Sequence, residues 1–104
     1  MGIFDWLKTP DIHKGVEEYR NTPGALLLDV RTGAEYAEGH IPGSVNIPMQ
    51  FLDEPVAEDT DTPIFVYCLS GGRSRQAAAM LRREGYTKVK DIGGIAAYTG
   101  EVEK

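Results

Sequence analysis

The chain has 104 residues, of which 41% are hydrophobic and 26% charged, and we expect one soluble globular domain over residues 1–104, with an N-terminal extension at 1–8 and an acidic tail at 101–104. Its net charge of −5 argues against a nucleic-acid partner, which would require a basic face. The single cysteine excludes an internal disulfide and a zinc site built from several thiolates.

The N-terminal residues and the hydropathy of the chain argue against secretion and membrane insertion. Residues 1–11 have no basic region, and Asp5 and Lys8 interrupt their apolar run, unlike a secretory signal peptide. No segment approaches the roughly 20 apolar residues of a membrane span. We therefore expect a cytoplasmic protein with no membrane partner.

The first expected element is a helix capped by Thr9, since the proline that follows suits the first helical position. Ile12, Val16 and Tyr19 then recur at helical spacing and indicate a buried stripe. The sequence Asn-Thr-Pro-Gly at 21–24 ends this helix.

A buried strand and a short capped helix follow. Residues 26–30 form a continuous apolar run, typical of a strand covered on both faces. Thr32 and Glu35 have the spacing of a capping box, which predicts a short helix that ends at Gly39. Residues 41–44, Ile-Pro-Gly-Ser, predict a type II turn.

The middle of the chain contains weaker signals. We expect a second strand at 45–47 and a short helix at 48–52. Five carboxylates lie in the stretch 53–61, which indicates a solvated loop, with an acidic docking surface as the alternative.

The last third of the chain alternates again between strand and helix. Residues 64–68 predict a third buried strand, and 73–84 a strong helix ended by the next glycine. A fourth strand is expected at 89–92, with Gly93 and Gly94 breaking it before a last short helix at 95–98.

Strands that alternate with helices predict an α/β fold with a parallel central sheet of four to five strands, flanked by helices on both faces. In such sheets ligands bind beyond the carboxyl ends of the strands. Asp29, Arg31 and Cys68 all fall at these ends, so we expect the functional site there.

Cys68 and the residues that follow it, Leu-Ser-Gly-Gly-Arg-Ser, carry the clearest chemical signal. Two adjacent glycines allow backbone N–H groups to converge, and the start of the next helix adds unpaired N–H groups and a positive dipole end. Such an anion cradle lowers the pKa of a thiol at its rim. We therefore expect Cys68 to be a nucleophile rather than an inert strand residue, and Arg73 to add a cation.

Two stretches together resemble the rhodanese, or thiosulfate sulfurtransferase, family: LLLDVRTGAEYAEGHIPGSVNIP at 26–48 and CLSGGRS at 68–74. The later segment VKDIGGI also fits, so the resemblance extends over about residues 9–100. It implies a rhodanese-like domain of the single-domain type, with helices on both sides of a parallel sheet and one active-site cysteine.

The resemblance implies a sulfurtransferase in which Cys68 takes sulfane sulfur from a donor, thiosulfate or a persulfide, and passes it to a thiol or other nucleophile. No cofactor is expected, and the two histidines and one cysteine form no metal motif. Arg73 is expected to hold the anionic end of the donor, while Ser74 either bonds the thiolate or caps the helix. The substrate-binding residues implied are Leu69, Ser70, Gly71, Gly72, Arg73 and Ser74.

Two alternatives stay open. The first alternative is a cysteine phosphatase, or an arsenate reductase of related fold. Phosphatases place the arginine one position further from the cysteine than Arg73 is from Cys68, so transfer of sulfur is favoured over phosphate chemistry. The other is a sulfur-relay or protein-interaction module, whose partner would dock on 53–61. Leu69 is apolar where many relatives carry a basic residue, so we expect weak thiosulfate affinity and a persulfide or polysulfide donor.

Four further residues are expected to support the site. Arg31 is predicted to pair with Glu35, and Asp29 to accept backbone N–H groups. His40 is predicted to hold its turn by a hydrogen bond. The alternatives are substrate steering by Asp29 and Arg31, and acid–base chemistry by His40.

Overall fold

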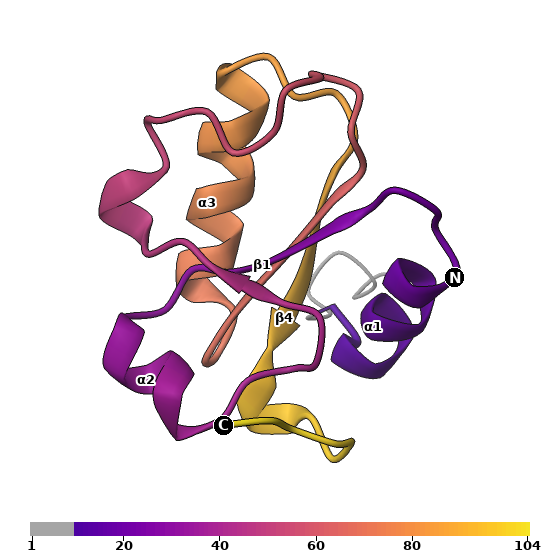
Figure 1. Ribbon diagram of the computed structural model, residues 1–104, viewed down its shortest axis with the longest axis vertical. Helices are drawn as coiled ribbons and strands as arrows, with labels where there is room; N and C mark the ends of the chain where they lie inside the picture. The colour runs from indigo at the N-terminus through magenta and orange to yellow at the C-terminus, as the bar shows by residue number, and fades with distance from the viewer. Residues whose placement is uncertain (1–9) are drawn as a thin grey trace, which may run out of the picture.

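The computed structural model describes residues 10–104, and its architecture confirms the expected α/β class (Figure 1). Four strands form one parallel sheet in the order β2-β1-β3-β4. The elements, with 3-10 helices labelled η, are α1 (Ile12–Arg20), β1 (Leu26–Asp29), α2 (Gly33–Glu38), β2 (Val45–Asn46), η2 (Met49–Phe51), β3 (Ile64–Cys68), α3 (Gly72–Arg83), β4 (Val89–Gly94) and η3 (Ile95–Ala97).

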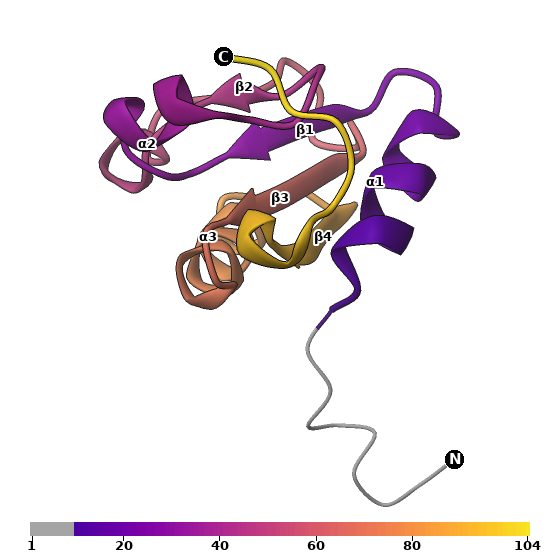
Figure 2. The same cartoon turned by 90° about the horizontal axis from the view of Figure 1, so that it is seen from below.

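Helices cover both faces of the sheet, as expected (Figure 2). Successive residues of a strand point to opposite faces, so Leu27 packs in one core with Val16 of α1. Its neighbour Leu28 packs in the other core with Leu81 of α3. Burial of each such side chain contributes about 1.5–3 kcal/mol, so both layers are needed for the fold.

The first helix begins later than the sequence predicts. Asp11 is the N-cap of α1, and its carboxylate accepts hydrogen bonds from the backbone N–H groups of His13 (3.0 Å) and Lys14 (3.4 Å). The expectation that Pro10 is the first helical residue is therefore wrong, and the predicted cap Thr9 lies outside the described residues. No helix in residues 10–104 is long and apolar enough to cross a membrane.

The turn and cap signals between β1 and β2 are confirmed. The Thr32 hydroxyl accepts a hydrogen bond from the Glu35 N–H (3.2 Å), while the Glu35 carboxylate accepts one from the Thr32 N–H (3.0 Å). The Ser44 N–H donates to the Ile41 carbonyl (3.0 Å), with the turn glycine between them at φ +89°. These local rules therefore position α2 directly beyond the carboxyl end of β1.

The last strand does not end where the sequence predicts. Gly93 and Gly94 continue β4 rather than breaking it, because the register shifts by one residue opposite Tyr67. This irregularity pairs Gly94 with Cys68. The strand therefore extends to the edge of the sheet that carries the cysteine.

Candidate functional site

Cys68 is the last residue of β3, and the chain turns sharply after it to start α3 at Gly72. The residue is 1% exposed and is a free thiol. Its position between a buried strand and a helix N-terminus is the one that the sequence predicts.

Backbone amides of the following loop converge on the sulfur of Cys68. The N–H of Gly71 donates to Sγ at 3.0 Å and that of Ser74 at 3.3 Å. Gly71 is the N-cap of α3 and has φ +106°, a left-handed conformation that favours glycine and turns its amide toward the sulfur. Both amides belong to the N-terminal turn of α3, so the positive end of the helix dipole also faces Sγ.

The side chain of Ser74 also reaches the sulfur. Its Oγ lies 3.5 Å from Sγ of Cys68 and donates a hydrogen bond to Oδ1 of Asp91 at 2.7 Å. Ser74 is the third residue of α3 and not its cap, so the expectation that it caps the helix is wrong. Asp91 on β4 also accepts from the Gly93 N–H (3.0 Å), which anchors this chain of contacts to the sheet.

The surroundings of Cys68 favour its ionised form. Burial alone would raise the pKa of the thiol, but hydrogen bonding with the side chain of Ser74 and with the backbone of Ser74, Gly71 and Arg73 outweighs it. The net result is a pKa below the ordinary value of a cysteine. The thiolate is the reactive form of cysteine, so this arrangement activates Cys68.

The first residues of the loop are held by β4 and η3. The Leu69 carbonyl accepts a hydrogen bond from the Ala96 N–H at 3.0 Å. A Cβ added to Gly94 would lie 2.2 Å from that carbonyl oxygen and 2.7 Å from Cα of Ser70. Glycine at 94 is therefore required for the loop to pack against the sheet.

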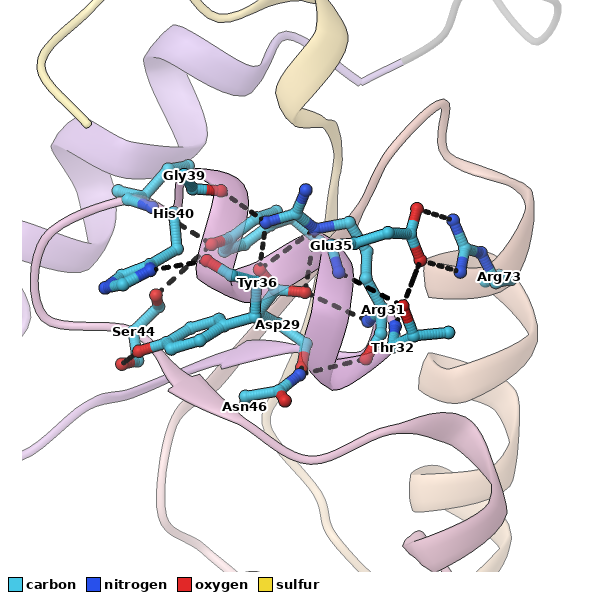
Figure 3. A network of polar contacts seen from close by, with 12 residues as sticks. Asp29, Arg31, Thr32, Glu35, Tyr36, Gly39, His40, Ser44, Asn46 and Arg73 are labelled. Carbon is cyan, nitrogen blue, oxygen red and sulfur yellow. Dashed lines mark hydrogen bonds and ion pairs between the residues drawn. The ribbon is translucent and has the colours of Figure 1, made fainter. Parts of the chain in front are cut away.

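Glu35 and Arg73 form an ion pair between α2 and α3 (Figure 3). Nη1 and Nη2 of the guanidinium donate to the two carboxylate oxygens at 2.7 and 2.9 Å. Arg73 is the main cause that lowers the pKa of Glu35 to about 2; burial opposes it and Thr32 assists. The cation that the sequence predicts for a donor anion is thus already engaged by a carboxylate.

Arg31 pairs with Asp29 and not with Glu35, which corrects the predicted pairing (Figure 3). Nη2 of Arg31 lies 2.7 Å from Oδ2 of Asp29 and also donates to the Gly39 carbonyl at 2.7 Å. The side chain of Arg31 folds back onto the end of β1, while the capping box turns Glu35 toward α3. Asp29 accepts the Arg31 N–H (2.9 Å), as expected, and is fully buried, so substrate steering by Asp29 has no support.

His40 has the structural contacts that the sequence predicts. Its ring stacks on Tyr36 with centroids 3.7 Å apart, and Nδ1 is 2.8 Å from the Tyr36 carbonyl oxygen. Its backbone forms a two-way bridge with Glu103, with both N–H···O distances 2.8 Å. Among residues 10–104 no hydrogen bond joins the His40 ring to the cysteine loop.

Three residues near the site were not singled out for it from the sequence. Asn46 donates hydrogen bonds to the carbonyls of Asp29 (3.0 Å) and Arg31 (2.9 Å), and Asp91 and Gly94 support the cysteine loop. Of these residues, only Gly94, as part of the glycine pair 93–94, carries a local signal in the sequence, and that signal predicts the end of a strand rather than support of the loop. Within the described range no group of three or more His, Cys, Asp or Glu side chains is arranged to hold a metal ion.

Comparison with known proteins gives consistent matches. A model of the rhodanese-like domain family matches residues 13–101. A sulfurtransferase of Allochromatium vinosum is 41% identical over 80 residues, which is 75% of each chain. The thiosulfate sulfurtransferase PspE of Escherichia coli is 37% identical over 71 residues, 65% of this chain and 68% of PspE. A structure described as a rhodanese with anions from E. coli has a TM-score of 0.72 at 31% identity, covering 77% of this chain and 98% of its own.

Proposed function

The chain belongs to the rhodanese-like domain family, and from that premise we propose that it is a sulfurtransferase that carries sulfane sulfur as a persulfide on Cys68. The single observation that carries the proposal is the convergence of the Gly71 and Ser74 amides on Sγ. These donors stabilise a thiolate without a general base.

The reaction has two sulfur-exchange steps. In the first, the Cys68 thiolate attacks the outer sulfur of the donor, a new S–S bond forms, and the donor's own S–S bond breaks. Its electron pair leaves on sulfite when the donor is thiosulfate and on a thiolate when it is a persulfide. In the second, an acceptor thiolate or cyanide attacks the outer sulfur of the Cys68 persulfide, and the Cys68 thiolate is regenerated. No external oxidant or reductant enters either step.

The amides of the loop and helix have a second task once sulfur is bound. The outer sulfur atom of the persulfide carries the negative charge. It therefore also requires nearby hydrogen-bond donors, like the backbone N–H groups that now face Sγ. The N-terminal turn of α3 supplies these as fixed dipoles, which need no rearrangement during the reaction. Of the remaining loop residues, Leu69 lies beside the approach to this position, while Ser70 and Gly72 are exposed to solvent.

The ion pair at the rim favours sulfur transfer over phosphate chemistry. A phosphatase needs its arginine fork for the phosphate oxygens, but both terminal nitrogens of Arg73 are bonded to Glu35. The same pairing weakens attraction for the thiosulfate dianion. It therefore supports a persulfide or polysulfide as the physiological donor.

A protein acceptor, as in a sulfur relay, would use the same chemistry. Its candidate docking surface is the loop at 53–61, whose carboxylates are solvent-exposed: Asp53, Glu54, Glu58, Asp59 and Asp61. Such a partner would present a basic face.

Mass spectrometry of the intact protein tests the proposal. After incubation with thiosulfate or an organic persulfide, and removal of the donor, wild type should gain one sulfur atom and Cys68→Ser should gain none. Ser70→Ala, which changes an exposed loop side chain, should still be loaded. Absence of an adduct with every sulfane donor, together with hydrolysis of an aryl phosphate, would replace sulfur transfer by phosphatase activity.

A further inference from the structure

A pocket of about 350 Å³ opens beside the cysteine loop, between α2, η3 and the C-terminal segment. Its volume lies within the range of pockets for small organic ligands, about 300–1,000 Å³. Thiosulfate, with five non-hydrogen atoms, would leave most of this space unfilled. The size of the pocket therefore points to a donor with an organic group.

Apolar side chains form one wall of this pocket. Leu69, Ile95, Ala96 and Val102 all line it. Leu69 and Val102 are 42% and 45% exposed, and they account for two of the four exposed large hydrophobic residues in the described chain. Two solvated apolar side chains at one pocket suit the alkyl part of a ligand.

Val102 owes its position to the C-terminal segment. The backbone bridge between His40 and Glu103 fixes this segment against the chain just after α2. The methyl group Cγ2 of Val102 lies above Gly39, where an added Cβ would come within 3.8 Å of it. The backbone bridge at His40 therefore holds one wall of the pocket in place.

The charged residues of the pocket leave a net negative charge. Arg31 is neutralised by Asp29, and Glu35 is neutralised by Arg73. Glu38, the last residue of α2, also lines the pocket, is exposed, and has no ion-pair partner among residues 10–104. Its carboxylate disfavours a second anionic group on the bound donor.

We propose that this pocket binds the organic group of a persulfide donor that has a neutral or cationic, rather than anionic, substituent, with Leu69 and Val102 as its apolar wall. The proposal rests on the persulfide chemistry of Cys68. The donor's outer sulfur is transferred to Cys68, its S–S bond breaks, and its thiolate leaves from the pocket and takes up a proton from water.

Three persulfides of similar size, each with more than twice the non-hydrogen atoms of thiosulfate, test the charge preference: those of 4-(aminomethyl)benzyl mercaptan, 4-(hydroxymethyl)benzyl mercaptan and 4-(mercaptomethyl)benzoate, with thiosulfate as the fourth donor. In wild type, kcat/KM should be higher for the cationic and neutral persulfides than for the carboxylate. Glu38→Lys should raise kcat/KM for thiosulfate and for the carboxylate persulfide by ~3- to 10-fold at low salt and lower it for the cationic persulfide. Glu84→Lys is the matched control, because Glu84 caps the far end of α3, and should change each value less than twofold.

A pair of valine variants tests the apolar wall. Val102→Ser should raise KM for all three persulfides and leave thiosulfate unchanged, whereas Val45→Ser, at an equally exposed valine of β2, should change neither. Equal responses of the Glu38 and Glu84 variants, or of the two valine variants, would overturn the proposal. Mass spectrometry distinguishes failure of the pocket proposal from failure of the proposed function. If only the pocket proposal is wrong, Cys68 still gains sulfur from the donors; if the proposed function is wrong, it gains none.

Discussion

The contact of Ser74 with Cys68 is the residue-scale feature on which the chemistry depends. Sγ accepts hydrogen bonds from the Gly71 and Ser74 amides and lies 3.5 Å from the Ser74 hydroxyl oxygen, while that hydroxyl donates to Asp91 at 2.7 Å. Ser74 is the largest of the contributions that lower the pKa of Cys68. The effect of the Ser74 side chain on the pKa of Cys68 should therefore be measurable by titration of the thiol.

Removal of this hydroxyl should make the thiol less acidic. In Ser74→Ala the pKa of Cys68 should rise, because burial still disfavours the thiolate and one hydrogen bond to it is lost. The pH dependence of iodoacetamide alkylation measures the shift, with the midpoint moving to higher pH. Ser70→Ala serves as the control, and an unchanged midpoint in Ser74→Ala would mean that the amides alone set the acidity.

At the scale of elements, the pair Glu35–Arg73 links the start of α2 to the start of α3. Glutamine at 35 can keep the capping box with Thr32 but cannot form an ion pair. Glu35→Gln therefore isolates the pair. Because these side chains are partly exposed, its contribution to the free energy of unfolding is about 1 kcal/mol or less.

The pH dependence of this difference has a definite sign. The folded-state pKa of Glu35 is lowered to about 2, so the pair stabilises the fold above the ordinary glutamate value of 4.5, and this stability is lost as pH falls toward 2. Urea unfolding of wild type and Glu35→Gln should differ most at pH 7 and converge as pH falls below 4.5. Glu38→Gln, on the same helix, should show little difference at either pH; a gap between wild type and Glu35→Gln that is independent of pH would contradict the assignment.

The same variant should change donor use. Without the Glu35 carboxylate, Nη1 and Nη2 of Arg73 are available to a dianion, so kcat/KM for thiosulfate should rise by ~3- to 10-fold. Steady-state assays at fixed ionic strength measure this, and a fall in thiosulfate activity would instead assign the pair a role in holding the loop.

The close approach of β4 to the cysteine loop makes Gly94 a sensitive position. Gly94→Ala should displace the backbone at Leu69 and Ser70, at a cost of about 1–3 kcal/mol, and lower kcat/KM by up to ~100-fold because the amide cradle moves. Gly33→Ala is the control, since its added methyl meets only an ordinary contact at 3.8 Å. Wild-type activity in Gly94→Ala would show that the loop adjusts without loss of geometry.

Sequence rules predicted the parts of the site that depend on neighbours along the chain. The capping box of Thr32 and Glu35 and the helix start after Cys68 are such parts. The partner of Arg31 was mispredicted because Glu35, the expected partner, is bound by Arg73 of the distant helix α3, which leaves Arg31 to pair with nearby Asp29. The path of β4 through Gly94 was mispredicted because it depends on how β4 pairs with β3. Asp91 had no local signal, since its hydrogen bond to Ser74 crosses from β4 to α3.

At the scale of the whole molecule, the sheet separates two cores, and only one of them contains the cysteine. Leu28 and Cys68 belong to the core under α3, whereas Leu27 belongs to the core under α1. The two leucines are adjacent and equally buried. They therefore offer a matched pair for separating stability from reactivity.

We expect substitution of either leucine to lower stability by a similar amount, but only one of the two substitutions to change the reactivity of Cys68. Leu27→Ala and Leu28→Ala should each lower the free energy of unfolding by about 2–5 kcal/mol in urea titrations. Only Leu28→Ala should alter the alkylation rate of Cys68, because the cavity left by this substitution lies in the core that contains Cys68. Equal effects of both variants on alkylation would mean that reactivity follows global stability.

The central claim is that the Cys68 persulfide is a true intermediate, and a single-turnover experiment tests it most directly. Sulfur-loaded protein, freed of donor, is mixed with cyanide in a rapid-quench apparatus, and thiocyanate and protein mass are followed together. One thiocyanate should form per loaded Cys68 as the protein returns to its unloaded mass, at a rate at least equal to kcat. Release of sulfur more slowly than kcat, or thiocyanate formation without loss of the adduct, would contradict the account.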